Sequence, residues 1–179
     1  SARLVETRKV SIALIGNFSS GKSTLINSLI GIDVLPTGNV PVTAQVYRLG
    51  AHPTYGYGYH PPRTVHPKLK KSSERKLSQS VHTLHERSER AQELRSDWLY
   101  VGIKDWLLSP RLSLLDTPGY NSENPLHAEC TVQALPYADL AVFVTEARGL
   151  SRSDLDFIQD YIAPQVSRIA VILNKVDIV

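Results

Sequence analysis

The residues with the clearest chemistry form one glycine-rich segment near the start of the chain. The stretch 16–23, GNFSSGKS, has the spacing G-x-x-x-x-G-K-S, with two glycines ahead of a lysine and a hydroxyl. Glycine lets the backbone curl so that successive N–H groups converge on phosphate oxygens, and a helix that follows adds its partial positive charge. Lys22 is then expected to reach the β- and γ-phosphates of a nucleotide, and the Ser23 hydroxyl to ligate Mg²⁺. The alternative is a glycine-rich turn before a helix, without a ligand.

A second segment suits the metal ion and the terminal phosphate of the same ligand. Asp116 and Gly119 belong to the segment DTPG, which follows the apolar run LSLL. A carboxylate at the end of a strand can hold Mg²⁺ through a water molecule, and the N–H of a glycine can approach the γ-phosphate closely. D-x-P-G is also a common turn sequence, so this segment indicates a nucleotide site only in combination with the first segment.

A third segment, NKVD at 174–177, follows the apolar run IAVIL and could select the base of the nucleotide. Asp177 can accept hydrogen bonds from N1–H and N2–H₂ of guanine, whereas adenine has neither donor in that arrangement. The wrong base would leave the carboxylate unpaired, which makes such a site discriminating. Lys175 is expected to lie over the base and Asn174 to brace the loop. A charged turn is the alternative for this segment alone, but the three segments together predict a guanine-nucleotide site.

These segments need a scaffold that presents their loops at one edge, and the apolar pattern provides it. Apolar runs alternate with helical segments, which is typical of an α/β fold with a mainly parallel sheet and helices on both faces. A helix is expected at 22–30, and another begins near Ser151 and stops before Pro164. A short strand at 98–103 is expected to pair with the strand after Arg111. The other expected strands are 10–15, 44–49, 112–115, 140–145 and 169–173.

The stretch at about 51–97 differs from the rest and is interpreted as a polar helical insertion between the second and third strands. It opens with TYGYGYHPP, which favours a mobile or hairpin-like loop over a surface that stacks on a base or a partner. Leu77, Val81 and Leu84 follow at helical steps and indicate one face of a surface helix. Residues 63–95 hold nine Lys or Arg against four Glu, which favours a solvated helix face over an RNA or membrane contact. His82 and His85 have no acidic or cysteine partner at metal-ligand spacing, so zinc is not expected.

The segment GNFSSGKSTLINSLIGIDVLPTGNVPVTA resembles the dynamin-like GTPases of the P-loop GTPase superfamily, particularly the bacterial and mitofusin-related branch. The marks are the serine pair before GKS, the LPTGN loop, and Thr43, 21 residues beyond Lys22. Further similarity lies in LSPRLSLLDTPG and ALPYADLAVFVTEA, so the resemblance covers about 10–49 and 98–179. It implies a GTP hydrolase with a three-layer fold that normally continues beyond NKVD. Residues 1–179 are therefore expected to be a GTPase domain that is incomplete at the C-terminus and has no stalk.

The resemblance also implies roles for individual residues. Thr43 is similar to the switch-I threonine, whose hydroxyl ligates Mg²⁺ and whose N–H meets the γ-phosphate. Ser19 holds the position that contacts K⁺ or Na⁺ and the β–γ bridging oxygen. Catalysis is thus expected from Lys22, Ser19, Thr43 and Gly119, and metal binding from Ser23, Thr43 and, through water, Asp116. Nucleotide contacts are expected from Asn17, Phe18, Ser19, Ser20, Gly21, Lys22, Ser23, Thr24, Asn174, Lys175 and Asp177.

Two positions depart from the family pattern. Phe18 stands where dynamins proper often carry a glutamine, so the role of that position does not transfer. Tyr120 follows DTPG, where small regulatory GTPases place a glutamine that orients water, and it has no carboxamide. The attacking water is instead expected to be held by backbone near Thr43 and Gly119, with homodimerisation across the nucleotide face assisting catalysis.

Composition narrows the classes of protein and of partner. The chain is 42% hydrophobic and 21% charged, as in ordinary soluble globular proteins. Cys130 is its only cysteine, which excludes an intrachain disulfide and agrees with a cytoplasmic location. A net charge of +3 gives no reason to expect a nucleic-acid partner. No apolar run approaches the roughly 20 residues that span a bilayer, so any membrane contact is expected to be peripheral and to use segments outside this chain.

The motifs together predict GTP binding and Mg²⁺-dependent GTP hydrolysis, coupled to nucleotide-dependent dimerisation or assembly. The resemblance adds membrane remodelling as the process served. One alternative is a GTP-gated binding switch with slow turnover, resembling ribosome-assembly or translation GTPases. Another is a nucleotide-binding scaffold without catalysis.

Overall fold

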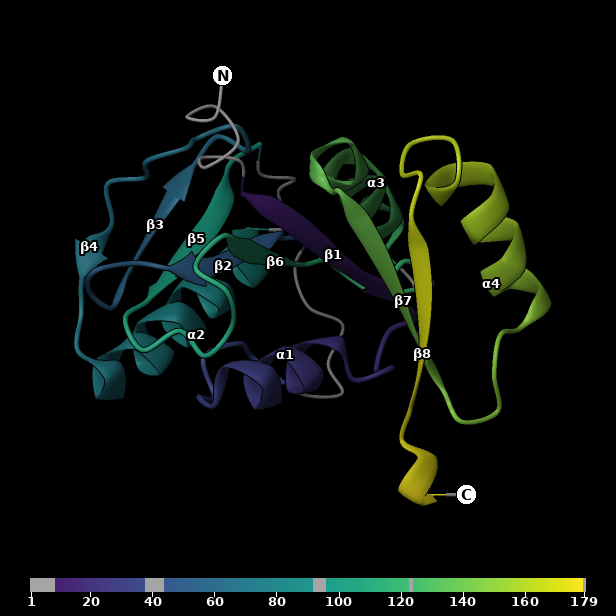
Figure 1. Ribbon diagram of the computed structural model, residues 1–179, viewed down its shortest axis with the longest axis horizontal. Coiled ribbons are helices and arrows are strands. Elements are labelled where there is room, and N and C mark those ends of the chain that lie inside the picture. Colours follow the sequence, from purple (N-terminus) through teal and green to yellow (C-terminus); the bar gives the residue numbers. More distant parts are fainter. Residues whose placement is uncertain (1–8, 38–43, 92–95, 123, 179) are drawn as a thin grey trace.

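The protein folds as an eight-stranded sheet with helices on both faces, as the alternating apolar pattern predicts (Figure 1). The computed structural model describes residues 9–37, 44–91, 96–122 and 124–178. The strand order is β4-β3-β5-β2-β6-β1-β7-β8. The sheet divides into a parallel half that carries the predicted ligand segments and a half in which the strand direction changes.

Four neighbouring strands form the parallel half. They are β1 (Val10–Gly16), β6 (Leu112–Asp116), β7 (Leu140–Glu146) and β8 (Ile169–Asn174). β1 lies between β6 and β7, and Ala13 pairs with Leu115 on one side and Ala141 on the other. Because the carboxyl ends of parallel strands meet at one edge of a sheet, the segments that follow β1, β6 and β8 come together there.

The other half of the sheet reverses direction at β2 (Tyr47–Ala51). β2 is antiparallel to β6 and parallel to β5 (Trp98–Ile103). The prediction that residues 98–103 pair with the strand after Arg111 is therefore wrong, because β2 lies between β5 and β6. All six residues of β5 are buried, which suits a strand covered on both faces and paired on both sides.

The tyrosine- and glycine-rich segment after β2 adds two further strands to the sheet. β3 (Gly56–His60) pairs antiparallel with β5, and β4 (Lys70–Lys71) pairs antiparallel with β3 at the edge. The expectation of a hairpin-like segment thus matches the β3–β4 pairing, and the expectation of a mobile loop does not. Alternating tyrosine and glycine fits a strand whose side chains point to opposite faces.

Two helices cover each face of the sheet (Figure 1). On one face lie α1 (Lys22–Ile30), which ends at Gly31 as predicted, and α2 (Glu74–Ala91). On the other face lie α3 (Pro125–Ala134) and α4 (Arg152–Phe157). Short helical turns at Leu135–Tyr137, Ile158–Ile162 and Val176–Ile178 complete the described structure.

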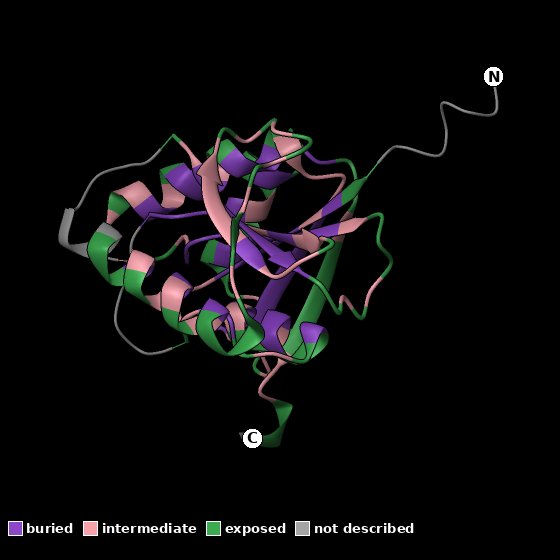
Figure 2. Ribbon diagram, turned by 90° about the vertical axis from the view of Figure 1, so that its left-hand side faces the viewer, coloured by how far each residue is buried: buried purple, intermediate pink, exposed green. Residues whose placement is uncertain are grey.

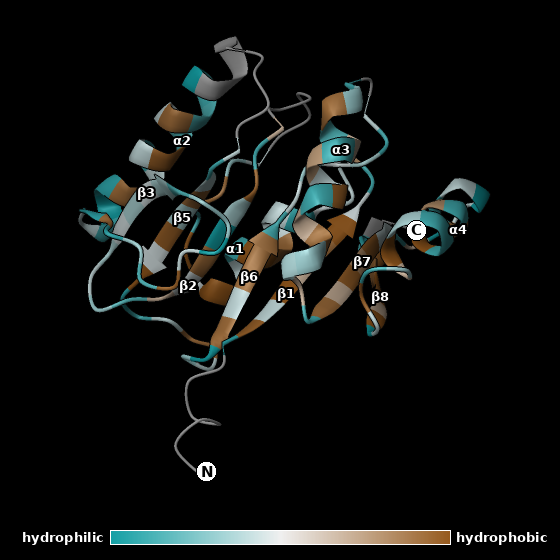
Figure 3. Ribbon diagram, turned by 90° about the horizontal axis from the view of Figure 1, so that it is seen from above, coloured by the Kyte–Doolittle hydropathy of each residue, from teal (hydrophilic) through white to brown (hydrophobic). Residues whose placement is uncertain are grey.

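The hydrophobic colour lies mainly on the strands of the sheet, while α2 and α4 carry much of the hydrophilic colour (Figure 3). Leu77 and Val81 bury the apolar face of α2 against the sheet, as their helical spacing predicts. Cys130 of α3 is buried in the opposite cluster, beside Ala134 and Phe143. Burial raises the pKa of the Cys130 thiol from 9.0 to about 12.

The last strand, β8, forms an edge of the sheet and remains exposed (Figure 2). Val171, Ile172 and Leu173 are 46%, 38% and 53% exposed, although their sequence is that of a buried strand. Within the part of the chain that the structure describes, no helix has both the length and the apolar character needed to cross a membrane.

Candidate nucleotide site

The loop between β1 and α1 curls in a way that few residues allow. Gly16 has a φ of 154° and Gly21 a φ of 89°, which side chains rarely adopt. A Cβ at Gly16 would lie 2.2 Å from the carbonyl oxygen of Val144, and one at Gly21 would lie 2.3 Å from the amide nitrogen of Asn174. Ser19 adopts a left-handed φ of 59° without being glycine. This tight curl is the backbone geometry that a phosphate cradle requires.

Lys22 lies buried at the start of α1, with 7% of its surface exposed. Its Nζ donates hydrogen bonds to the carbonyl oxygens of Gly16, at 3.1 Å, and Asn17, at 2.8 Å. Burial lowers the pKa of Lys22 from 10.5 to about 8, and the nearby carboxylate of Asp116 opposes this lowering. A buried ammonium group is costly without a counter-charge, so this position favours an anion such as phosphate.

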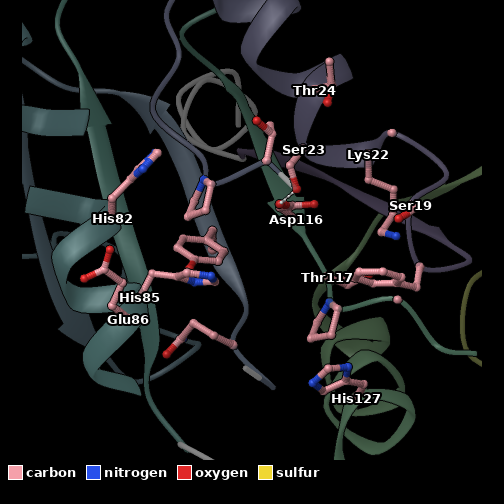
Figure 4. Close-up of a pocket in the computed structure, with 18 of the residues that line it drawn as sticks. Ser19, Lys22, Ser23, Thr24, His82, His85, Glu86, Asp116, Thr117 and His127 are labelled. Atoms are coloured by element: carbon pink, nitrogen blue, oxygen red, sulfur yellow. Dashed lines mark hydrogen bonds between the residues drawn. The ribbon is translucent and has the colours of Figure 1, made fainter. Parts of the chain in front are cut away.

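Ser23 and Asp116 meet at the centre of the site (Figure 4). The Ser23 hydroxyl donates to Oδ2 of Asp116 at 2.7 Å. Burial raises the pKa of Asp116 from 3.8 to about 6, while the Ser23 hydrogen bond and Lys22 lower it. The other carboxylate oxygen, Oδ1, is buried and has no hydrogen-bond partner among the described residues.

This pair of oxygen ligands fits a magnesium ion. Mg²⁺ prefers hard oxygen ligands, keeps several waters, and is commonly bound by one or two protein oxygens together with phosphate oxygens. The unpaired Oδ1 of Asp116 suits a bridging water, and the Ser23 hydroxyl suits direct coordination. The described residues contain no group of three or more His, Cys, Asp or Glu that could hold a metal by themselves.

The segment after β6 packs directly against the phosphate loop. A Cβ at Gly119 would lie 2.6 Å from both the backbone nitrogen and the Cα of Phe18. The Thr117 hydroxyl donates to the carbonyl oxygen of Leu14 at 2.7 Å, and the Tyr120 N–H donates to the carbonyl oxygen of Gly16 at 3.3 Å. Only glycine can bring its backbone this close, and so Gly119 packs its backbone against the loop.

Tyr120 turns toward α4 and away from the cavity. Its ring stacks on Phe157, with 4.0 Å between ring centroids, and its hydroxyl donates to Oδ1 of Asp154 at 2.5 Å. The same carboxylate oxygen accepts from the Asn17 amide at 2.7 Å. Asp154 also closes the N-terminal cap of α4 with Ser151, the helix start that the sequence predicts. Asp154 therefore ties the phosphate loop, the segment after β6 and α4 together, a link that the sequence alone did not indicate.

The segment after β8 contacts the phosphate loop from the other side. The Asn174 amide donates to the carbonyl oxygen of Ser20 at 3.0 Å. Lys175 has a left-handed φ of 57°, and its Nζ lies 3.1 Å from Oε1 of Glu146. Asp177 is exposed on the helical turn that follows. Asn174 thus links the predicted base-binding loop to the predicted phosphate loop.

A cavity of about 480 Å³ joins these groups. The sequence-predicted residues that line it are Phe18, Ser19, Gly21, Lys22, Ser23, Thr24, Asp116, Gly119 and Lys175. Asn17, Ser20, Asn174 and Asp177 lie outside its lining, although the Asn17 carbonyl oxygen accepts from Lys22 and the Ser20 carbonyl oxygen accepts from Asn174. Thr43 lies outside the described residues, so its predicted roles stay predictions.

The far wall of the cavity comes from α2, within the stretch interpreted as an insertion. His82, His85 and Glu86 face the cavity from this helix, opposite Lys22 and Ser19 (Figure 4). The sequence indicates His82 and His85 only as possible zinc ligands, which are not expected, and it does not indicate this placement. Their helical spacing puts them on one side of α2, and the packing of Leu77 and Val81 against the sheet, with the hydrogen bond between Tyr47 and His85, holds that helix beside the nucleotide cavity.

Two buried histidines near the cavity are held neutral by their surroundings. The Tyr47 hydroxyl is hydrogen-bonded to Nδ1 of His85. Burial lowers the pKa of His85 from 6.5 to about 4, with a smaller contribution from His82. His127 of α3 lies 2.6 Å from the Ser122 hydroxyl, and its pKa is also lowered, first by burial and then by Lys22.

A family model described as the dynamin family matches residues 12–176 of this chain. The chain belongs to the dynamin family. The matched region contains the whole phosphate loop and the segment after β6. The prediction of a dynamin-like GTPase domain with the α/β fold of P-loop GTPases is therefore confirmed.

Curated relatives of this chain are much longer than the region it spans. It is 25% identical over 177 residues to an uncharacterized protein of Caldicellulosiruptor sp. (strain Rt8B.4), covering 97% of this chain and 42% of that protein. It is 27% identical over 168 residues to the probable transmembrane GTPase FZO-like, chloroplastic, of Arabidopsis thaliana, covering 93% of this chain and 15% of that protein. The chain thus spans less than half the length of either relative.

Among solved structures, an oligomerised bacterial dynamin pair is similar, with a TM-score of 0.68 and 23% identity. The similarity covers 99% of this chain and 28% of that chain. That pair is described as providing a mechanism for the long-range sensing and tethering of membranes. At this level of identity the likeness concerns the fold alone.

Proposed function

We propose that this chain binds GTP with Mg²⁺ and hydrolyses it by attack of water on the γ-phosphate. The observation that carries the proposal is Lys22. Its ammonium group is buried and held on the carbonyl oxygens of a tightly curled loop. A cation in this position can neutralise charge that develops on the β- and γ-phosphates in the transition state.

The neighbouring groups support the remaining parts of the reaction. The Ser23 hydroxyl and the unpaired oxygen of Asp116 are the residues that would hold Mg²⁺, which supplies charge neutralisation on the phosphates. The close packing of Gly119 on Phe18 supports a γ-phosphate contact by the Gly119 N–H. We assign the attacking water to backbone groups near Gly119 and Thr43, and transition-state support through K⁺ or Na⁺ to Ser19. Guanine recognition is assigned to Asp177, with Lys175 over the base.

We further propose that turnover is coupled to homodimerisation across the nucleotide face. The similarity in fold to an oligomerised bacterial dynamin pair supports this coupling. The name of the Arabidopsis relative, a probable transmembrane GTPase, supports a function at a membrane. Membrane association would then use parts of a longer protein, which would be cytoplasmic or bound peripherally to a membrane.

The test is single-turnover hydrolysis of GTP and of ATP at several protein concentrations. We expect hydrolysis of GTP alone, at a rate that rises with protein concentration, and loss of hydrolysis in Lys22→Ala. Preference for ATP would refute the assignment of Asp177. A Ser19→Ala variant with an unchanged rate and an unchanged response to K⁺ would refute the role of Ser19.

A second candidate function is a GTP-gated switch with slow turnover. The orientation of Tyr120 favours it, because this side chain is committed to Asp154 and Phe157 instead of to a water near the γ-phosphate. A slow rate that does not change with protein concentration would support the switch. Tight GTP binding without hydrolysis would support a nucleotide-binding scaffold.

A further inference from the structure

A second cavity lies at the opposite end of the sheet from the nucleotide site. Its volume is about 540 Å³, against about 480 Å³ for the nucleotide cavity, and the two cavities share no lining residue. We call it the basic hollow and define it by Lys9, Arg48, Gly50, Arg63, His66 and Ser113 among its lining residues. Lys9 precedes β1 and Ser113 lies near the start of β6, whereas the phosphate loop follows the other end of β1.

The hollow exists because small residues stand where larger ones would fill the core. Gly50 and Ser113 pair across β2 and β6, and Ser113 shares a hydrogen bond with the Ser11 hydroxyl at 2.9 Å. A Cβ at Gly50 would meet its nearest atom, the Leu112 carbonyl oxygen, only at 3.7 Å. The floor of the hollow is therefore open enough to accept a larger side chain, or a ligand.

The segment after β3 forms one wall of the hollow and is fixed to the sheet by hydrogen bonds. The Tyr100 hydroxyl donates to the carbonyl oxygens of Pro61, at 3.0 Å, and Pro62, at 2.8 Å. Nη1 of Arg48 donates to the carbonyl oxygen of Pro62 at 3.1 Å. These contacts hold the wall in place, so the hollow is formed before any ligand binds.

Positive charge is concentrated in the hollow. Lys9, Arg48 and Arg63 each carry one positive charge, and two histidines add donors. No Asp or Glu stands among the described residues that line it. A nearby carboxylate, Asp139, is bound to the Ser11 N–H at 2.9 Å and is not part of the lining. Cations gathered without acidic residues mark a site for an anion.

Arg48 is oriented to receive that anion. Its guanidinium group is held by the Pro62 carbonyl oxygen and by the Ser11 hydroxyl, at 3.3 Å, and lies 5.6 Å from the ring centroid of Tyr100. Guanidinium has five N–H donors in a rigid plane that matches phosphate oxygens, so fixing the group leaves further donors in a defined geometry. Val65, Pro67 and Leu69 add an apolar side to the same space.

We propose that the basic hollow is a second binding site of this protein, specific for a phosphate monoester that carries an organic group. The cationic groups take the phosphate, and the apolar side takes the organic part. Glycerol 3-phosphate and the headgroup of phosphatidic acid share this chemistry, so a soluble metabolite and a lipid are the two sources. The inference rests on residues outside the nucleotide cavity and is independent of the proposed hydrolysis.

The test compares glycerol 3-phosphate, by titration calorimetry, with vesicles of phosphatidylcholine with and without phosphatidic acid, by co-sedimentation. Gly50→Val fills the floor with a residue that strands favour. Arg63→Glu reverses an exposed charge at the rim, and Arg75→Glu on α2 is the matched control away from the hollow. Both hollow variants should weaken binding about tenfold or more, whereas Arg75→Glu and Lys22→Ala should leave it unchanged.

The two arms separate the sources of phosphate. Binding of glycerol 3-phosphate with this variant pattern identifies a soluble ligand, and vesicle binding alone with the same pattern identifies the lipid headgroup. The proposal is overturned if neither ligand binds. It is also overturned if binding is unchanged in Arg63→Glu, or if binding is lost in Lys22→Ala. Thermal melting shows whether Gly50→Val is folded. If it is not, the surface variant Arg63→Glu tests the proposal in its place.

Discussion

Gly119 lies so close to the phosphate loop that a side chain there would displace backbone atoms. In Gly119→Ala the new Cβ would stand 2.6 Å from the nitrogen and Cα of Phe18, neither of which can rotate away. We expect GTP affinity to fall by about tenfold or more, because the loop must shift to relieve the clash. Binding of a fluorescent GTP analogue measures this loss.

Gly50→Ala is the matched control, since its Cβ would have no neighbour nearer than 3.7 Å. It adds the same methyl group to a strand remote from the loop and should bind the analogue normally. Equal affinity in both variants would contradict the packing of Gly119 on the loop.

His85 gives the stability of the fold a dependence on pH. Its pKa is about 4 in the folded protein and 6.5 when exposed, so the unfolded chain binds more protons between these values. The stabilisation is complete above about pH 6.5 and is lost as the pH falls toward 4, by at most about 3 kcal/mol. Urea unfolding at a series of pH values measures the free energy of unfolding.

His85→Gln removes the titrating group and keeps an acceptor for the Tyr47 hydroxyl. Its stability should fall less steeply than that of the parent protein between pH 6.5 and pH 5, where few carboxylates titrate. Parallel curves for the two proteins would show that His85 is not the group responsible.

At the scale of elements, the N-terminus of α4 supports the phosphate loop through Asp154. The carboxylate accepts hydrogen bonds from Asn17 and Tyr120 through one oxygen and from Ser151 through the other. We expect Asp154→Ala to destabilise the fold by about 2–3 kcal/mol and to weaken GTP binding several-fold, because Asn17 loses its partner. Thermal melting and nucleotide titration measure the two effects.

Ser151→Ala separates helix capping from support of the loop. It removes the capping hydroxyl at a cost of about 1 kcal/mol but leaves Asp154 bound to Asn17. Stability should fall while GTP affinity stays unchanged. If both variants reduced affinity alike, capping alone would account for the effect.

Most elements could be predicted because their signals are local. The phosphate loop, the helix at 22–30 and the capped helix at Ser151 each depend on residues close together in sequence. The position of β2 between β5 and β6 could not be predicted, because apolar runs of similar length do not specify their partners. For the same reason, the position of α2 in the cavity wall and the role of Asp154 could not be predicted, since both depend on contacts between distant segments.

For the molecule as a whole, the exposed strand β8 is the surface most prone to unwanted pairing. Among the described residues β8 is the last strand on its side of the sheet, and its apolar side chains at 171–173 are exposed, which is the situation that favours pairing with another strand. We expect the 179-residue chain to associate in a concentration-dependent way even without nucleotide. Sedimentation velocity at several concentrations measures this association.

Val171→Lys should reduce this association, because a charge on an edge strand opposes strand addition. The same change should leave any GTP-dependent dimer intact, since position 171 lies outside the nucleotide cavity. A chain that stays monomeric at all concentrations without nucleotide would contradict the prediction.

The buried thiol of α3 can be used to measure internal motion of the protein. Cys130 is the only cysteine, is 5% exposed, and has a pKa raised to about 12, so a thiol reagent can modify it only after α3 moves off the sheet. Its labelling rate therefore counts such openings without any engineered probe. Since α3 follows directly on the segment that packs against the phosphate loop, slower labelling with nucleotide would reveal how far occupation of the site rigidifies its surroundings.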